Sequence, residues 1–397
     1  MATAKKTTKK KVDVAKEVAE PKAPKEVEFI ETGDIGLDLA LTNGKGIPLG
    51  SNIMFFGKPG HGKTTIFGDM IKRLLVRYQK ANIPFRIHYI DSENSRELLT
   101  SLGVFDFVYD NEDYAPQQVI YHPNVQTFEE AEEILDRIVG KIVKDKLVVD
   151  KNDVWRKDVK LIFIDSMTNL ISKTQLANNV DKADYGDNAK ARKKFYLKYL
   201  ARLREFGSTT FWTSQVSVKQ NILNQYEDPN KLAASEFDQH NMEIIVKLVK
   251  STDSKRTELK KVKVMTIDGE QEVQTRYITK LYPGQVQYTK NRFGQDIPVE
   301  ILVKPGKYVI NAFTIKNVLE MNKCIKMLDK DTWTMCDDLA TYLGPDVLKD
   351  LDPKALSPRD VNIICSNNTG KLVKYAKDRE IYKVTVGEAK EPDDGLY

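Results

Sequence analysis

Residues 57–65 read Gly-Lys-Pro-Gly-His-Gly-Lys-Thr-Thr, a complete G-x-x-x-x-G-K-T loop. The six residues before it, Ser-Asn-Ile-Met-Phe-Phe, predict a strand, and residues 64–78 predict a helix. Between a strand and a helix, such a loop points backbone N–H groups at phosphate oxygens, beside the positive end of the helix. An ordinary glycine-rich turn is the alternative, and it is disfavoured because both the full pattern and its context are present.

The loop predicts the ligand as well as its location. Lys63 is expected to reach the β- and γ-phosphates, and the Thr64 hydroxyl is expected to bind Mg²⁺. We therefore expect ATP and Mg²⁺ as cofactors. The predicted nucleotide contacts are Gly57, Lys58, Pro59, Gly60, His61, Gly62, Lys63, Thr64 and Thr65.

Composition narrows the class of protein. A chain of 397 residues can form one large α/β domain and a smaller one. The net charge of +5 permits a polyanionic partner without requiring one. The three cysteines form no CxxC pair, which favours a reducing compartment, and neither a membrane-spanning run nor a signal-peptide core is visible. We expect a soluble, intracellular, cytoplasmic protein without a membrane partner.

Apolar runs alternate with helical patterns through most of the chain. The runs 86–90, 161–164 and 209–213 predict strands, and residues 128–143 and 189–206 predict helices. This alternation indicates an α/β fold with a mainly parallel central sheet flanked by helices. Farther along, residues 262–267 and 272–279 predict a β-hairpin about a turn at 268–269.

Changes in composition suggest four segments. We expect a disordered basic tail at 1–28, an ATPase core at 29–304, a smaller α-rich domain at 305–387 and an acidic tail at 388–397.

Three polar residues follow predicted strands, where parallel sheets place their sites. Asp165 follows the run 161–164 and is expected to orient Mg²⁺ or its water. Glu93 is either a general base for attack on the γ-phosphate or an acid that caps a helix start. Gln215 either hydrogen-bonds the γ-phosphate or is an ordinary polar residue at a strand end.

Two long polar segments, 172–188 and 216–238, lack a regular apolar period, and loops of that length are usually functional or mobile. The helix between them is rich in lysine and arginine. Its basic face is either simply solvated or part of a groove for a phosphate backbone.

These motifs occur in the order and spacing of the RecA recombinase family. The chain resembles bacterial RecA and the UvsX-type phage recombinases over about 29–303. The segments that carry the resemblance are Ile30-Glu-Thr-Gly-Asp-Ile-Gly-Leu-Asp-Leu-Ala-Leu41, Ile47-Pro-Leu-Gly50, the phosphate loop, Ile90-Asp-Ser-Glu93, Ile162-Phe-Ile-Asp-Ser166 and Thr213-Ser-Gln215.

The resemblance implies a RecA-like P-loop NTPase core, DNA-dependent ATP hydrolysis, and filaments that pair single-stranded with double-stranded DNA. Mediator or single-strand-binding proteins would be further partners, with a location at the nucleoid or at replicating DNA. The implied catalytic residues are Glu93, Lys63, Gln215, Lys290 and Arg292, the last two acting across a subunit interface. The implied DNA-binding residues, in loops 172–188 and 216–238, are Lys173, Lys182, Lys219, Asn221 and Lys231.

Two other functions share the same phosphate chemistry. One is a RecA-fold DNA motor or recombination mediator, such as a ring-forming helicase-like ATPase. The other is a non-catalytic assembly protein that keeps ATP as a structural ligand. The segment 216–238 also lacks the glycine-rich, methionine- and phenylalanine-bearing pattern of the bacterial family, so no base-inserting residue is assigned.

Overall fold

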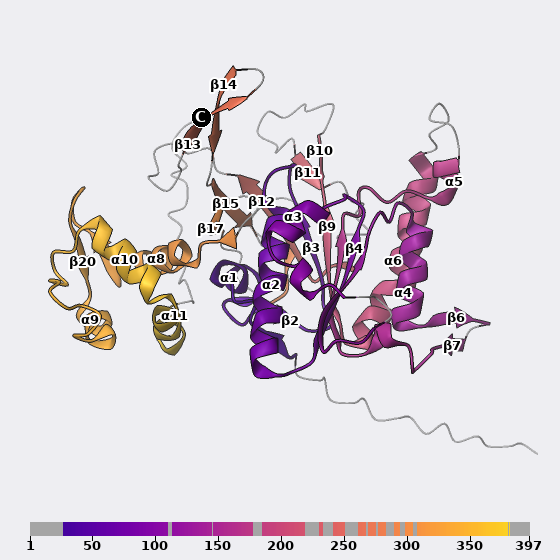
Figure 1. Ribbon diagram of the computed structural model, residues 1–397, viewed down its shortest axis with the longest axis horizontal. Helices are drawn as coiled ribbons and strands as arrows, with labels where there is room; N and C mark the ends of the chain where they lie inside the picture. Colours follow the sequence, from indigo (N-terminus) through magenta and orange to yellow (C-terminus); the bar gives the residue numbers. More distant parts are fainter. Residues whose placement is uncertain are drawn as a thin grey trace, which may run out of the picture.

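The structure is a computed structural model (Figure 1). It describes residues 27–109, 113–144, 146–177, 185–218, 230–232, 241–250, 261–266, 269–274, 277–282, 290–293, 298–304, 308–379 and 381.

A ten-stranded mixed sheet forms the centre of the molecule, in the order β18-β17-β15-β12-β3-β9-β8-β4-β5, with β16 paired to β12. Its strands are β3 (Asn52–Phe56), β4 (Phe85–Asp91), β5 (Gln117–His122), β8 (Val159–Asp165), β9 (Thr209–Ser214), β12 (Ile244–Lys250), β15 (Tyr277–Tyr282), β16 (Lys290–Asn291), β17 (Val299–Lys304) and β18 (Tyr308–Val309). All neighbours from β12 to β5 are parallel, and β15, β17 and β18 extend the sheet in antiparallel pairs. The expected mainly parallel sheet is confirmed.

Helices cover both faces of this sheet (Figure 1). The helices are α1 (Ile35–Thr42), α2 (Lys63–Ala81), α3 (Arg96–Ser101), α4 (Phe128–Val139), α5 (Lys173–Ala177), α6 (Tyr185–Phe206), α8 (Asn311–Met321), α9 (Asp337–Leu343), α10 (Pro358–Asn367) and α11 (Thr369–Asp378). Because strand residues alternate between faces, Ile53 and Phe55 pack in the cluster of α1, α2 and α3, whereas Met54 and Phe56 pack with α4 and α6. None of the helices in the described part has the length and apolar character needed to cross a membrane.

Aromatic packing anchors the helix that follows the phosphate loop. Phe67 of α2 is fully buried, and its ring centroid lies 5.1 Å from those of Phe55 and Phe163 and 5.5 Å from that of Phe211. Each such burial contributes about 1.5–3 kcal/mol. The start of α2 is therefore held rigidly above three strands of the sheet.

The predicted helix at 128–143 is wrong in its last residues. α4 ends at Val139, and residues 141–143 form strand β6, which pairs with β7 (Lys146–Val148) in a separate ribbon. Gly140 adopts φ 88° and ψ 168°, which breaks the helical path, and β-branched residues such as Ile142 and Val143 favour an extended chain.

The predicted hairpin at 262–279 is confirmed only in its first part. β13 (Lys261–Thr266) pairs with β14 (Gly269–Gln274). The residues after it form β15, which joins the main sheet between β12 and β17, because its apolar residues Ile278 and Leu281 are buried there. The long uniform strand expected at 272–279 is therefore two strands.

Besides β13–β14, four two-stranded ribbons of the described residues lie outside the main sheet. The ribbons are β1 (Phe29–Ile30) with β2 (Ile47–Pro48), β6 (Lys141–Val143) with β7 (Lys146–Val148), β10 (Val216–Val218) with β11 (Asn230–Leu232), and β19 (Ile325–Met327) with β20 (Trp333–Met335). The segments predicted as long polar loops thus contain regular structure, since α5 lies in 172–188 and the β10–β11 ribbon lies in 216–238.

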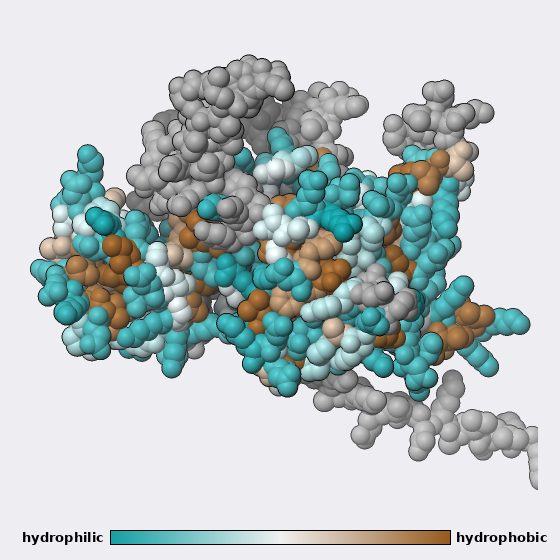
Figure 2. All heavy atoms as spheres, in the orientation of Figure 1, coloured by the Kyte–Doolittle hydropathy of each residue, from teal (hydrophilic) through white to brown (hydrophobic). Residues whose placement is uncertain are grey.

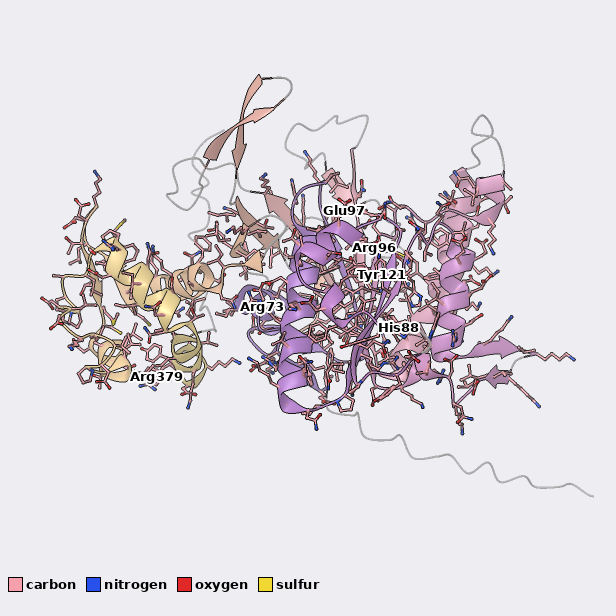
Figure 3. The ribbon with its side chains drawn as sticks, in the orientation of Figure 1. Arg73, His88, Arg96, Glu97, Tyr121 and Arg379 are labelled. Atoms are coloured by element: carbon pink, nitrogen blue, oxygen red, sulfur yellow. The ribbon has the colours of Figure 1, made fainter. Side chains whose placement is uncertain are left out.

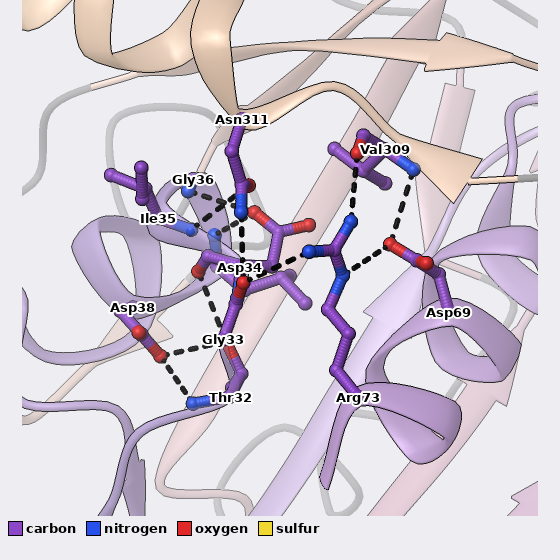
Figure 4. A network of polar contacts seen from close by, with 11 residues as sticks. Thr32, Gly33, Asp34, Ile35, Gly36, Asp38, Asp69, Arg73, Val309 and Asn311 are labelled. Atoms are coloured by element: carbon purple, nitrogen blue, oxygen red, sulfur yellow. Dashed lines mark hydrogen bonds and ion pairs between the residues drawn. The ribbon is translucent and has the colours of Figure 1, made fainter. Parts of the chain in front are cut away.

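The C-terminal part of the chain forms a smaller, helix-rich unit that packs on α1. Its core is formed mainly by α8 to α11 and the β19–β20 ribbon, with Ile35 of α1 contributing. Side chains of α2 hold the strand that leads into it (Figure 4): Arg73 Nη2 donates to Val309 O at 2.9 Å, and Val309 N donates to Asp69 Oδ2 at 3.1 Å. Asn311 Nδ2 donates to Gly33 O at 2.8 Å. The phosphate-loop helix is therefore linked by hydrogen bonds to the α-rich unit.

Candidate functional site

The phosphate loop joins the carboxyl end of β3 to the start of α2, and each of its glycines meets a steric requirement. A Cβ on Gly57 would lie 2.7 Å from Leu248 O, so only hydrogen fits there. Gly60 and Gly62 have φ of 75° and 92°, which side chains disfavour. His61 is tied down, with Nδ1 3.0 Å from Leu248 O. The loop path is consequently set by its own sequence and by β12.

The start of α2, at this loop, has neither a capping side chain nor an acidic residue in its first turn. Its N-cap residue is Gly62. Lys63 is buried, and its Nζ donates to Gly57 O at 2.9 Å and to Lys58 O at 3.3 Å. Burial lowers the pKa of Lys63, while the charges of Glu93 and Asp165 raise it. Helix N–H groups and a buried ammonium suit a polyphosphate, so the residues present fit ATP.

The Asp165 carboxylate is fully buried beside Thr64. Thr64 Oγ1 donates to Asp165 Oδ2 at 3.0 Å, Tyr89 Oη donates to the same oxygen at 2.6 Å, and Thr213 Oγ1 donates to Oδ1 at 2.5 Å. Burial raises the pKa of Asp165, the Glu93 charge adds to that rise, and the three hydroxyl donors oppose it. A cation at this point would favour the charged form.

The two residues predicted to bind the metal therefore lie together, at the carboxyl edge of the sheet. Hydroxyl and carboxylate oxygens are hard ligands of the kind that Mg²⁺ takes beside substrate phosphates. Within the described residues there is no cluster of three or more His, Cys, Asp or Glu arranged for a metal. The donor set fits a cation that is shared with a nucleotide better than one held by the protein alone.

Glu93 and Gln215 meet near the same edge. Gln215 Nε2 donates to Glu93 Oε1 at 3.4 Å, a long hydrogen bond that links the ends of β4 and β9. Glu93 lies in the loop between β4 and α3, where Ser95 caps the helix without its side chain. The carboxylate that binds backbone N–H groups there is Asp91, whose oxygens accept from Glu93 N at 2.9 Å and Ser95 N at 2.7 Å. The capping role considered for Glu93 belongs to Asp91.

Sequence reasoning assigned no role to several residues that support the site. Tyr121 (labelled in Figure 3) donates to Asp91 Oδ2 at 2.6 Å. Ser92 Oγ donates to Ser166 O at 2.8 Å and accepts from Ser166 N at 2.7 Å, which joins the loops after β4 and β8. Tyr89 was the most visible signal, because a fully buried phenol hydroxyl requires a polar partner.

Lys290 and Arg292 lie away from the phosphate loop of their own chain. β16 pairs with the first residues of β12, with Lys290 opposite Ile245, whereas the loop follows the other end of the parallel strand β3. Arg292 Nη1 lies 3.7 Å from Oε1 of Glu243, and Glu243 Oε2 accepts from Asn52 N at 2.8 Å. The structure thus does not bring this basic pair to the other predicted catalytic residues within one chain.

The predicted DNA-binding residues are only partly described. Lys173 starts α5, and its Nζ lies 3.3 Å from Glu133 Oε1 in an exposed ion pair. Lys231 lies in β11, opposite Ser217, and only its backbone is described. Lys182, Lys219 and Asn221 lie outside the described residues.

Comparison with known proteins gives a partial match. No protein-family model matches the chain. The RecA proteins of Rickettsia conorii, Rickettsia prowazekii and Rickettsia massiliae are each 26% identical to it over 200 residues. The match covers 50% of this chain, and the chain spans about half (49%) of the length of these relatives. With the sheet described above, this similarity supports an α/β RecA-like core, and it does not single out UvsX-type recombinases.

Proposed function

We propose that this chain is a DNA-dependent ATPase of the RecA type that forms filaments on single-stranded DNA and promotes pairing and strand exchange with double-stranded DNA. The observation that carries the proposal is the Glu93–Gln215 contact. Gln215 directly precedes β10, the first strand of the segment assigned to DNA. One residue therefore connects the carboxylate above the nucleotide site to the proposed DNA loop.

Each residue has a distinct task in this proposal. The loop N–H groups and Lys63 bind the phosphates of ATP, and Thr64 and Asp165 hold Mg²⁺. The bound cation would neutralise charge on the phosphates. Glu93 accepts the proton of the attacking water and Gln215 senses the γ-phosphate, so that hydrolysis changes the position of β10. Asp91 and Tyr121 keep the Glu93 loop in place through the hydrogen bonds described above.

Lys290 and Arg292 act in a neighbouring subunit's site under this proposal. Their place beside the start of β12 keeps them from the phosphate loop of their own chain, which supports a role across an interface. A guanidinium from the next subunit would stabilise charge that develops on the γ-phosphate. ATP is then a ligand of the filament interface as well as the fuel.

A basic surface on α6 supports DNA as the polyanion. Lys190, Lys193, Lys194 and Lys198 line a shallow pocket with Leu197, which is 63% exposed. Lys198 lies 2.9 Å from Glu132 and 3.1 Å from Asp136, and Lys190 lies 3.6 Å from Asp187, so acidic neighbours offset part of the positive charge of this surface. Contacts of this kind with a phosphate backbone weaken as the salt concentration rises, because the release of counterions from the DNA then becomes less favourable.

The proposal also assigns the segments. Residues 29–304 form the ATPase core, residues 305–387 form the small domain, and residues 1–28 and 388–397 are tails. The separate apolar cluster of α8 to α11 supports the small domain. Mediator or single-strand-binding proteins are proposed as partners because the filament would compete with other proteins for single strands.

The test is ATP hydrolysis with and without single-stranded DNA, followed by microscopy of the protein on DNA with a slowly hydrolysed ATP analogue. We expect hydrolysis to rise many-fold with DNA, and Glu93→Gln to abolish that rise while nucleotide binding stays. No stimulation by any nucleic acid would refute the proposal. Rings instead of filaments would favour a helicase-like motor, and absence of hydrolysis in the unaltered chain would favour a structural ATP ligand.

A further inference from the structure

The β6–β7 hairpin is an outgrowth whose two strands pair only with each other within the described residues. It follows α4 and precedes β8, so it replaces what could be a short connection. Gly140 is required at its base, because a Cβ there would lie 2.5 Å from Val149 Cγ2. Lys144, directly after β6, has φ 50°, a backbone conformation that is common in tight hairpin turns. The hairpin thus has a defined backbone conformation, although none of its described residues belongs to the apolar clusters of the core.

The hairpin exposes aliphatic side chains on both faces. Ile142 pairs with Leu147 on one face, and these side chains are 50% and 55% exposed. On the other face Val143 (42% exposed) and Val148 (55% exposed) alternate with Lys146 and Lys141. Figure 2 shows this as a hydrophobic patch between hydrophilic ends, at the end of the molecule opposite α9 to α11 in Figure 1. Isolated two-stranded hairpins are marginally stable in water, so such exposure indicates a binding surface.

The size of the patch indicates a short, extended partner. Four half-exposed aliphatic side chains offer on the order of 300 Å², well below the roughly 800 Å² per partner of a stable protein–protein interface. A free strand edge can compensate, because an added strand contributes main-chain hydrogen bonds. The hairpin is therefore suited to a peptide segment that adds as a third strand.

The net charge of the hairpin indicates which peptide segment it would bind. Residues 141–148 contain three lysines and one aspartate, a net charge of +2, which disfavours pairing with a second copy of the same hairpin. Residues 388–397 of the chain contain four acidic residues and one lysine, a net charge of −3. Just before them, residues 382–386 read Tyr-Lys-Val-Thr-Val, a strand-forming alternation of apolar and polar residues.

We propose that residues 382–397 of one copy dock on the β6–β7 hairpin of a second copy, with 382–386 added at a strand edge and the acidic residues beside the lysines. The segment follows α11, which lies at the opposite end of the molecule from the hairpin (Figure 1). A contact between opposite ends of successive copies is heterologous and repeats along a chain of subunits. It therefore gives copies of this protein a tether that involves neither nucleotide nor DNA.

A fluorescent peptide of residues 382–397 tests the proposal when it is titrated into the full-length protein and followed by anisotropy. We expect saturable binding that weakens with added salt, and at least a tenfold loss of affinity in the double variant Ile142→Asp/Leu147→Asp. The matched control is Leu328→Asp, a change at another aliphatic residue (56% exposed) outside the hairpin. Unchanged urea denaturation of the variants shows that the protein is folded.

Charge reversal makes the test specific. Lys141→Glu/Lys146→Glu is expected to lose the native peptide and to recover binding to a peptide whose four acidic residues are replaced by lysine. No saturable binding, or equal binding by the hairpin and control variants, overturns the proposal. Mixed isotope-labelled copies treated with an amine cross-linker should join Lys144 to Lys390 between copies, and links within one copy only would overturn docking in trans. Because ATP and DNA are absent, failure here is separate from failure of the proposed ATPase.

Discussion

Replacing Asp165 separates the structural role of its carboxylate from its chemical one. Tyr89 and Thr213 are fully buried and donate to this carboxylate. In Asp165→Ala both donors lose their acceptor, and an unsatisfied buried donor costs about 1–3 kcal/mol, so about 2–6 kcal/mol is at risk. Removal of a buried charge, whose cost is evident in the raised pKa of Asp165, offsets part of this. We expect a net loss of about 2–4 kcal/mol in the free energy of unfolding.

Asp165→Asn is the matched variant. Its amide oxygen can still accept from Tyr89, and its NH₂ group can donate to the Thr213 hydroxyl after that hydroxyl rotates. Since the buried charge is also removed, the expected loss is below about 1 kcal/mol. Both variants lack the anionic oxygen for Mg²⁺, so both should lose ATP hydrolysis by a factor on the order of 10–100 or more.

Urea denaturation at neutral pH, with the slope m compared between variants, measures the stability change, and phosphate release measures hydrolysis. Equal destabilisation by alanine and asparagine would refute the hydrogen-bond argument. Full hydrolysis by Asp165→Asn would refute the metal role and leave the structural role intact.

Three further predictions concern other parts of the molecule. Lys63→Ala should weaken binding of a fluorescent ATP analogue at least tenfold without unfolding the protein, and unchanged affinity would contradict the phosphate site. Burial lowers the pKa of His88 well below 6.5 and that of His122 to about 3. As the pH falls, these histidines therefore bind protons in the unfolded chain before they do so in the folded protein. The free energy of unfolding is therefore at its full value above about pH 6.5, and below that pH it falls by about 1.4 kcal/mol per pH unit for each histidine. His122→Gln should reduce the dependence of the urea midpoint on pH. Arg73→Ala should lower the free energy of unfolding by about 2–3 kcal/mol, because it leaves the mostly buried Asp69 carboxylate without its cation. Arg77→Ala, in an exposed ion pair, should lower it by less than about 0.5 kcal/mol. Equal urea midpoints for the two variants would contradict the importance of the contact between α2 and Val309.

Much of the core was predictable from local patterns. The apolar run before the loop, the amphipathic α2 and the buried strand that ends in Asp165 each follow from residues close together in the sequence. Parallel strands end at one edge, so their terminal residues were expected to meet, and Thr64, Asp165, Glu93 and Gln215 do lie there.

The errors came from residues whose conformation depends on a single backbone position or on distant contacts. The periodicity of α4 continues formally through Ile142, but Gly140 ends the helix. Apolar period alone could not separate β14 from β15, since only the main sheet decides that residues 277–282 are buried between β12 and β17.

By itself, the sequence determined the phosphate loop, the α/β alternation and which residue types follow the strands at the carboxyl edge of the sheet, because these depend on neighbours along the chain. Only the tertiary structure decided which carboxylate caps the Glu93 loop, which hydroxyls hold Asp165, and that Lys290 and Arg292 lie away from their own phosphate loop. It also revealed the exposed β6–β7 hairpin. Those properties depend on strand order and on contacts between residues far apart in sequence, which no local pattern encodes.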